Sequence, residues 1–370
     1  MHTNSVTSQH IRIQNHNIHY LERKGDSIDT HADHADHADH ADNTLVIMFH
    51  GFPENAHTWE VLISELPNNF HIIAPDLPGY HKSEVLSRTS DYRIPALINR
   101  MADFVRTVSQ GKKVTLVGHD WGGAIAWPLA AFQPDLFHQL IILNAAHPST
   151  FTQALKTSSK QRKKSEYIKA LVAEDAEVEL RQTHFALLKG MLGDDMFTDY
   201  DRKAERKLLS DGASSVSTEN TENTDLADLA DRSCSDKSSF NNSYAGKSYA
   251  HKSSGDGNSK YNYVASLLSS WNDNETLSAM LNYYREMPQM APDENASAEV
   301  LASIRVPELR VELPTLVLWG RLDDAFDEGI LDGLAGYVSN LQIMYHDTAT
   351  HWVHREQAAW AARKITEFVA

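Results

Sequence analysis

A carboxylate flanked by glycines, Asp120, lies at the centre of the segment 118–123, which has the sequence GHDWGG. The β-branched apolar run before this segment predicts a buried strand, and the run after it predicts a helix. A strand, a tight turn and a helix in this order lift one side chain above the edge of a parallel sheet. Asp120 is ionised near pH 7, so it can attack a saturated carbon without first losing a proton. Such an attack forms an alkyl ester on the enzyme, which suits opening of a strained ring or displacement of a halide.

The elements that must position this carboxylate alternate between strand and helix, which predicts an α/β fold with a mostly parallel sheet covered on both faces. An antiparallel hairpin is predicted over 10–24, where 11–13 pairs with 18–20. Pro128 falls inside the helix that follows Asp120 and should kink or shorten that helix. The pattern predicts strands at 44–50, 70–75, 113–118, 138–143, 315–320 and 341–345, and helices near 57–66, near 92–109 and from 121.

The sheet pattern is interrupted, which predicts a core in two pieces, 1–148 and 305–370. The stretch between them, 149–304, is mostly helical and is expected to form a cap over the ligand-binding end of the sheet. At 30–42 the triplet His-Ala-Asp occurs four times. Alternating imidazoles and carboxylates could bind a metal, but the favoured interpretation is a solvated linker. A second low-complexity segment, 210–260, is rich in Ser, Asn, Asp, Lys and Gly and has no hydrophobic period.

Composition sets broad limits on function. The 370 residues are 41% hydrophobic, which is enough for one large core and an accessory domain. A net charge of -16 argues against nucleic-acid binding. No signal peptide and no membrane-spanning run is visible, so we expect a cytoplasmic protein without a membrane partner. The single cysteine, Cys234, excludes an internal disulfide and lies in the second low-complexity segment, where a catalytic thiol is not expected.

A second motif, HGFPE at 50–54, directly follows the first predicted core strand. Together with the motif around Asp120 it resembles the α/β-hydrolase superfamily, and within it the soluble epoxide hydrolase family. The resemblance implies that the N–H groups of Phe52 and Trp121 form an oxyanion hole for the ester. It also implies a cis peptide bond before Pro53. Three residues are expected to contact the substrate, namely His50, Pro53 and Trp352.

The resemblance also supplies the groups that break the ester. The water-activating base matches His351, in the loop after the last strand, and its carboxylate partner matches Asp323. Asp324 is the second choice for that carboxylate. Some relatives carry the acid after the preceding core strand, where this chain has Asn144, which cannot ionise. His354 is expected to face outward from the start of the last helix.

Opening an epoxide produces an alkoxide, which leaves only if an acid donates a proton to the ring oxygen. A tyrosine keeps its proton at neutral pH and can donate it. Epoxide hydrolases use two cap tyrosines, and the resemblance assigns these roles to Tyr284, in the segment 281–285, and to Tyr167. Tyr283 is expected to be a packing residue. The alternative is that both assigned tyrosines are half-buried aromatic side chains of the cap.

Two other functions remain open. A haloalkane or haloacetate dehalogenase of the same fold also uses an aspartate nucleophile, but haloalkane enzymes commonly have asparagine where this chain has Phe52. Haloacetate enzymes add arginines after the nucleophile, where this chain has Trp121 and Ala124. A non-catalytic binding protein would have no need of the nucleophile, base, acid and tyrosines together.

The favoured prediction is hydrolysis of an epoxide to a vicinal diol. The expected partners are a small apolar epoxide and water, with no metal and no organic cofactor. The protein is expected to be a monomer or homodimer. Which epoxide is used is not indicated by the sequence, because the packing of the cap sets the shape of the pocket.

Overall fold

Eight strands form one sheet in the order β1-β2-β4-β3-β5-β6-β7-β8, in a computed structural model that describes residues 5–26, 44–198, 200, 257–288 and 290–370. The pairs β1–β2 and β2–β4 are antiparallel, and the other neighbouring pairs are parallel. The predicted α/β fold is confirmed. The strands are β1 (Thr7–Ile13), β2 (His16–Arg23), β3 (Leu45–Phe49), β4 (His71–Pro75), β5 (Val114–His119), β6 (Phe137–Leu143), β7 (Thr315–Gly320) and β8 (Leu341–His346).

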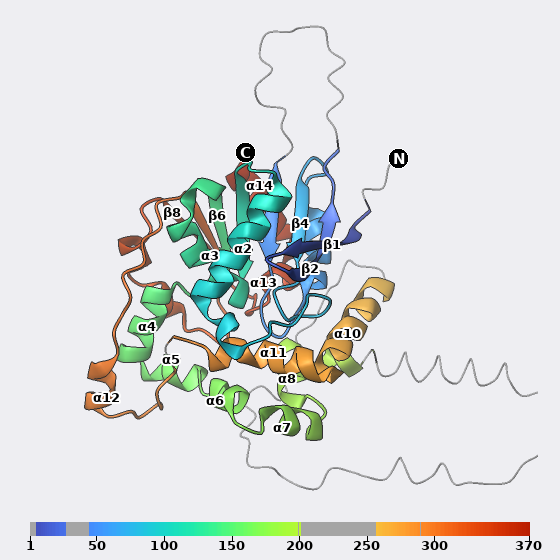
Figure 1. Cartoon of the computed structure of the whole chain (residues 1–370). Helices are drawn as coiled ribbons and strands as arrows, with labels where there is room; N and C mark the ends of the chain where they lie inside the picture. Colours follow the sequence, from blue (N-terminus) through green and yellow to red (C-terminus); the bar gives the residue numbers. More distant parts are fainter. Residues whose placement is uncertain (1–4, 27–43, 199, 201–256, 289) are drawn as a thin grey trace, which may run out of the picture. The chain divides into compact units, whose positions relative to one another are not determined.

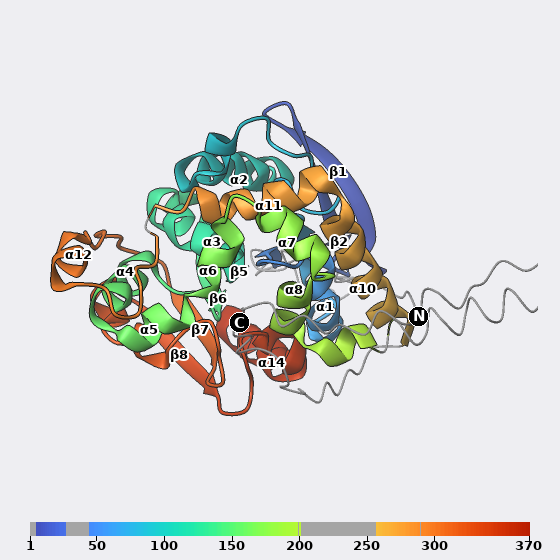
Figure 2. The same cartoon turned by 90° about the horizontal axis from the view of Figure 1, so that it is seen from below.

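Helices cover both faces of the sheet. Figure 1 shows α2 and α3 in front of the strands, and Figure 2 shows α1 beside α14. Apolar side chains of α1 and α14 join those of the strands in a buried cluster. Burial on both faces explains why the central strands are apolar throughout. These helices are α1 (Glu60–Glu65), α2 (Ile94–Ser109), α3 (Trp121–Phe132), α13 (Val353–Glu356) and α14 (Ala358–Val369).

A helical insertion follows β6 and precedes β7, as the sequence predicted. Its helices α4, α5, α6 and α11 lie beyond the carboxyl ends of the strands (Figure 1). The chain divides into two compact units, one of 1–179 with 251–370 and one of 180–250. The helices of the insertion are α4 (Pro148–Thr157), α5 (Ser159–Lys164), α6 (Tyr167–Val172), α7 (Ala176–Gln182), α8 (Ala186–Leu192), α10 (Gly257–Asn272), α11 (Asn274–Arg285) and α12 (Ala298–Ser303).

The structure corrects some predicted boundaries. The amino-terminal hairpin starts at Thr7, earlier than predicted, and pairs Ile11 with Ile18. The helix α3 continues past Pro128 as far as Phe132, so the proline does not end it there. Pro128 has no backbone N–H to donate within the helix. The apolar residues around it are buried, and this burial stabilises the helix.

The low-complexity segments fall mainly on residues that the structure does not describe. The His-Ala-Asp repeat at 30–42, Cys234 and the range 210–256 lie outside the described residues. The helix α10 begins at Gly257, so the last residues of the low-complexity segment 210–260 are helical although they show no hydrophobic period. Among the described helices, each one is too short or too polar to cross a bilayer.

The turn between β5 and α3 depends on close backbone packing. A Cβ atom on Gly122 would lie 2.1 Å from the carbonyl oxygen of Phe49, at the end of β3. This distance is far shorter than any van der Waals contact, so only glycine lets α3 begin directly against β3. This packing fixes the backbone of Asp120, the residue between β5 and α3, which has a φ of 48°.

We therefore expect Gly122→Ala to lower the free energy of unfolding by about 1–3 kcal/mol, because the extra methyl group pushes α3 away from β3. The measurement is urea unfolding followed by fluorescence. Gly336→Ala is the matched control, since a Cβ at Gly336 meets no atom within 4 Å. Equal stability of the two variants would contradict this account of the turn.

Candidate active site

The carboxylate of Asp120 lies between a backbone donor and an imidazole. Its Oδ1 accepts a hydrogen bond of 2.8 Å from the N–H of Phe52. Its Oδ2 lies 3.5 Å from Nε2 of His351. The approach is close, because a Cβ on Gly51 would lie 2.4 Å from the Cβ of Asp120. Trp121 is the first residue of α3, where backbone N–H groups have no intrahelical acceptor.

A second carboxylate orients the imidazole from its other side. Nδ1 of His351 lies 2.8 Å from Oδ2 of Asp323, so Nδ1 carries the proton of this hydrogen bond. The structure therefore joins His351 to Asp323, the first choice from the sequence, rather than to Asp324. Asn144, which occupies the alternative acid position, donates to the same Oδ2 at 2.7 Å.

The loop after β7 that carries Asp323, here called the acid loop, also donates backbone hydrogen bonds to this carboxylate. Its Oδ1 accepts from the N–H groups of Ala325 at 2.7 Å and Phe326 at 2.8 Å. Burial would raise the pKa of Asp323, but the charge and hydrogen bond of His351, with these N–H donors, outweigh it and lower the pKa. Asp323 is therefore ionised and fixed in position, which is what a residue that orients an imidazole requires.

The two carboxylates determine the charge of the imidazole. Burial by itself would lower the pKa of His351, but the charges and hydrogen bonds of Asp323 and Asp120 raise it to about 10. His351 is therefore an imidazolium at neutral pH while both carboxylates are ionised. A change that removes the charge of Asp120 must lower the pKa of His351.

The two assigned tyrosines lie together near the nucleophile. The ring of Tyr284 packs edge-on against Phe52 at 4.9 Å, Trp121 at 5.2 Å and Tyr167 at 6.2 Å between ring centroids. Burial is the main cause that raises the pKa of Tyr284 well above its usual value, with Tyr167 and Asp120 adding to it. A hydrogen bond from the Trp121 side chain opposes this rise. Tyr284 is thus a buried, protonated phenol, and Tyr167 is half-buried beside it.

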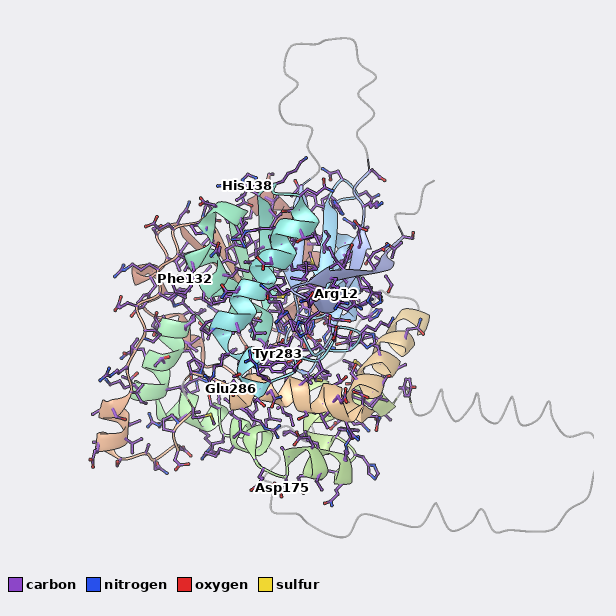
Figure 3. The ribbon with its side chains drawn as sticks, viewed as in Figure 1. Arg12, Phe132, His138, Asp175, Tyr283 and Glu286 are labelled. Carbon is purple, nitrogen blue, oxygen red and sulfur yellow. The ribbon has the colours of Figure 1, made fainter. Side chains whose placement is uncertain are left out.

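Tyr283 differs from its neighbour in function. Figure 3 shows it on α11, and its side chain is fully buried. Its hydroxyl donates a 2.8 Å hydrogen bond to the carbonyl of Pro78, in a loop of the core. Trp271 of α10 similarly donates to the carbonyl of Pro53 at 3.0 Å. These bonds hold α10 and α11 over the edge of the sheet where Asp120 lies.

The residues expected to contact substrate fall in different places. His50 is fully buried, and its two ring nitrogens bond the backbone at Gly51 O (2.9 Å) and Leu77 N (2.9 Å). The two bonds fix the ring of His50 against the backbone of the core, and its contact with substrate stays a prediction. Pro53 follows a cis peptide bond, as expected, and Trp352 packs its ring against His351.

A buried ionic cluster behind His351 was missed by the sequence analysis. Glu54 is fully buried and accepts hydrogen bonds of 2.6 Å from the hydroxyls of Thr58 and Tyr263. Its Oε1 lies 3.3 Å from Nε of Arg355. Burial would raise the pKa of Glu54, but Arg355 and His354 outweigh it and lower the pKa to about 2.

His354 belongs to this cluster, which contradicts the expectation that it faces outward. Its side chain is fully buried, with Nε2 2.8 Å from the hydroxyl of Thr58 and 3.5 Å from Glu54. Thr58 and Glu54 supply polar partners on the inner side of α13, so His354 faces the core. His119 is also buried, and its Nε2 lies 3.0 Å from the carbonyl oxygen of His351. The cluster therefore contacts the backbone of the proposed base.

A sequence signal for this cluster existed. Glu54 ends the HGFPE motif and His119 precedes the nucleophile, so both are polar residues at positions where the flanking strands are buried. Buried polar groups need partners, and partners for these two had to be found elsewhere in the chain. Spacing alone did not reveal that Arg355 and His354 supply them.

The same cluster contains residue types that bind metal ions in other proteins. Glu54, His119 and His354 place possible ligand atoms within 4.8 Å of one another. The guanidinium of Arg355 already balances the single carboxylate, so a divalent cation would leave excess positive charge fully buried. Nε2 of His354 also contacts the Thr58 hydroxyl. These residues do not fit a metal ion.

Comparison with known proteins places this geometry in context. A sequence profile described as alpha/beta hydrolase fold matches residues 44–357. Epoxide hydrolase 3 of Xenopus tropicalis is 37% identical over 34% of this chain and 34% of its own length. AB hydrolase superfamily protein YfhM of Bacillus subtilis (strain 168) is 25% identical over 88% of this chain and 90% of its own. The crystal structure of a Bacillus megaterium epoxide hydrolase with an inhibitor has a TM-score of 0.65, 24% identity, and coverage of 98% and 99%.

The imidazole of His351 should titrate near pH 10 in the resting protein, and Asp120→Asn should lower that pKa because one of the two carboxylate charges is lost. The measurement is an NMR titration of histidine side chains, with the signal assigned by its loss in His351→Gln. Because the folded pKa is raised, this group stabilises the fold below pH 6.5, and that stabilisation is lost as the pH rises through 10. Asp324→Asn is the control, and an equal shift in both variants would refute the assignment.

Glu54→Gln should lower the free energy of unfolding by about 3–5 kcal/mol at pH 7, because Arg355 is left buried without its carboxylate. The measurement is urea unfolding as a function of pH. The folded pKa of Glu54 is lowered to about 2, so its stabilisation is present above pH 4.5 and is lost as the pH falls towards 2. The difference from wild type should therefore shrink in acid. Glu60→Gln, which removes a partly exposed pair with His57, is the control and should cost less than about 1 kcal/mol.

Proposed function

Because the chain belongs to the alpha/beta hydrolase fold family, we propose that it hydrolyses an epoxide to a vicinal diol through a covalent ester on Asp120. The observation that carries this proposal is the pairing of a nucleophilic carboxylate with a buried, protonated phenol. Asp120 faces His351 on one side, and Tyr284 lies nearby against Phe52 and Trp121. The similar proteins that are named epoxide hydrolases support the same reaction class.

In the first step, Asp120 attacks one carbon of the epoxide ring. Its Oδ1 is held by the N–H of Phe52, so Oδ2, which faces His351, is the attacking oxygen and Oδ1 becomes the carbonyl oxygen of the ester. The carbon–oxygen bond of the ring breaks, and the departing oxygen takes a proton from Tyr284, with Tyr167 as the second phenol. The high pKa of Tyr284 keeps the proton on the phenol until the ring oxygen becomes basic.

Ester formation then changes the state of His351. The ester carries no charge, so Asp323 remains as the only carboxylate that faces the imidazole, and burial now lowers the pKa of His351. The imidazolium releases its proton, and the phenolate of Tyr284, which gave its proton to the ring oxygen, takes one up and returns to the phenol. The base is therefore produced by the first step and is available for the second.

In the second step, neutral His351 removes a proton from a water molecule that attacks the ester carbonyl carbon. Negative charge develops on Oδ1, where the N–H of Phe52 already donates, and the N–H of Trp121 is the second donor. Collapse of this intermediate breaks the ester bond, and the diol oxygen takes the proton from His351. The carboxylic acid of Asp120 then passes its own proton to His351, so Asp120 returns as a carboxylate and His351 as the imidazolium. Asp323 holds the imidazole in one tautomer throughout.

Halide displacement is less well supported by the same residues. A halide leaves without a proton and is stabilised by N–H donors. Here the Trp121 side chain is engaged with Tyr284, which is a proton donor with a raised pKa. The positions after Asp120 hold Trp121 and Ala124 and supply no arginine for a carboxylate substrate.

The proposed substrate is small and apolar, since Phe52, Trp121 and Tyr284 supply rings around the nucleophile. We propose that the core, 1–148 and 305–370, carries the nucleophile, the base and the acid, whereas the cap, 149–304, carries the phenols. The proposed reaction requires no metal or organic cofactor. We further propose that the protein works in the cytoplasm as a monomer or homodimer.

Purified protein should form diols from aryl or alkyl epoxides and release no halide from haloacetates or haloalkanes. Asp120→Asn should abolish diol formation, and Tyr284→Phe should lower kcat by about 100-fold to 10,000-fold, because general acid catalysis is worth that much. The measurement is chromatography of diols beside an assay for chloride and fluoride. Tyr283→Phe is the control, since its hydroxyl bonds the carbonyl of Pro78 and should affect stability more than kcat.

Halide without diol would replace this proposal with a dehalogenase and reduce both phenols to packing groups. Neither product from a folded protein would reject both enzyme activities and favour a binding protein. Trapped ester on Asp120, detected by mass spectrometry of peptides after rapid quenching, would support the covalent intermediate directly.

A further inference from the structure

The cap helix α5 contacts the loop that carries Asp323. Gln161 of this helix is fully buried, and its side-chain amide bonds two backbone groups of the loop. Its Nε2 donates to the carbonyl of Ala325 at 3.0 Å, and its Oε1 accepts from the N–H of Asp327 at 2.8 Å. Viewed from the cap side, α5 lies near β7 and β8, the strands before and after this loop (Figure 2).

Gln161 and Asp323 share one peptide plane. The peptide between Ala325 and Phe326 presents its carbonyl to Gln161 and its N–H to Oδ1 of Asp323 at 2.8 Å. A peptide group is planar, so it cannot rotate to lose one bond without losing the other. The cap side chain and the acid therefore hold this plane from opposite edges.

A second residue of α5 bonds the acid loop at Asp323 itself. Nζ of Lys164 donates to the backbone carbonyl of Asp323 at 2.5 Å. Lys160, in contrast, has a largely exposed side chain and pairs with the Asp327 carboxylate at 2.6 Å, farther along the loop. Gln161 and Lys164 thus contact the backbone that positions the acid, whereas Lys160 does not.

We propose that Gln161 is a positioning residue of the acid–base pair, with Lys164 in support: through the 325–326 peptide it fixes the Asp323 carboxylate against His351. The inference rests on the proposed function for its kinetic consequence. Asp323 acts on His351 in breakdown of the ester, so Gln161 affects that step and leaves ring opening unchanged. A cap residue thereby controls a step whose reacting groups all lie in the core.

The test compares Gln161→Met with Lys160→Met, the matched control on the same helix. Gln161→Met keeps the size of the side chain and removes its bonds to the loop, together with one to the Ser165 hydroxyl within α5. The first readout needs no substrate. It is the low-field proton resonance of the His351 Nδ1–H group, which reports the 2.8 Å bond to Asp323 and is assigned by its loss in His351→Gln. We expect this resonance to move upfield or broaden in Gln161→Met and to stay in place in Lys160→Met.

The second readout is single-turnover kinetics with an epoxide substrate. Ester breakdown should slow about tenfold in Gln161→Met, the effect of losing one well-placed hydrogen bond, while ester formation stays within about twofold. An unchanged resonance in a folded Gln161→Met protein would overturn the proposal, as would equal slowing of both steps. If Gln161→Met does not fold, Lys164→Met removes the bond from α5 to the carbonyl of Asp323 and should move the resonance in the same direction. Absence of any turnover would reject the proposed function, whereas the resonance would still decide the role of Gln161.

Discussion

One buried imidazole between two carboxylates is the interaction on which the site depends. His351 faces Asp323 through Nδ1 and Asp120 through Nε2, and both carboxylates lie in surroundings where charge is costly. Neither carboxylate is held by the imidazole alone. Backbone N–H groups at Phe52, Ala325 and Phe326 donate to their remaining oxygens. These hydrogen bonds to the two carboxylates therefore fix the backbone conformation of the loops at the sheet edge.

A second cluster of buried polar and charged residues contacts the backbone of His351. Glu54 and Arg355 form a buried pair, and His119 connects their neighbourhood to the backbone carbonyl of His351. Within the part of the chain that the structure describes, Oε2 of Glu54 and Nδ1 of His119 have no hydrogen-bond partner and face each other at 3.6 Å. The core behind the site is thus polar, although the strands around it are apolar.

The sequence predicted the sheet, the turn and the superfamily correctly because each has a local signature. Glycine at 122 reports a backbone contact, and apolar runs report strands buried on both faces. The errors involve residues whose environment depends on distant segments. His354 was expected at the surface, but Thr58 and Glu54 approach it from the other end of the chain. The motif position of His50 likewise did not indicate that both of its ring nitrogens bond the backbone.

The long insertion between β6 and β7 separates the reactive groups along the chain. In the proposed mechanism, Asp120 and its hydrogen-bond donor Phe52 come before the insertion, and Asp323 and His351 come after it. During synthesis the ribosome therefore completes the nucleophile long before the groups that regenerate it. In the proposed mechanism, a polypeptide that stopped inside the insertion would lack both residues that break the ester, Asp323 and His351. The proposed turnover therefore depends on core segments from both sides of the insertion, which are synthesised at different times.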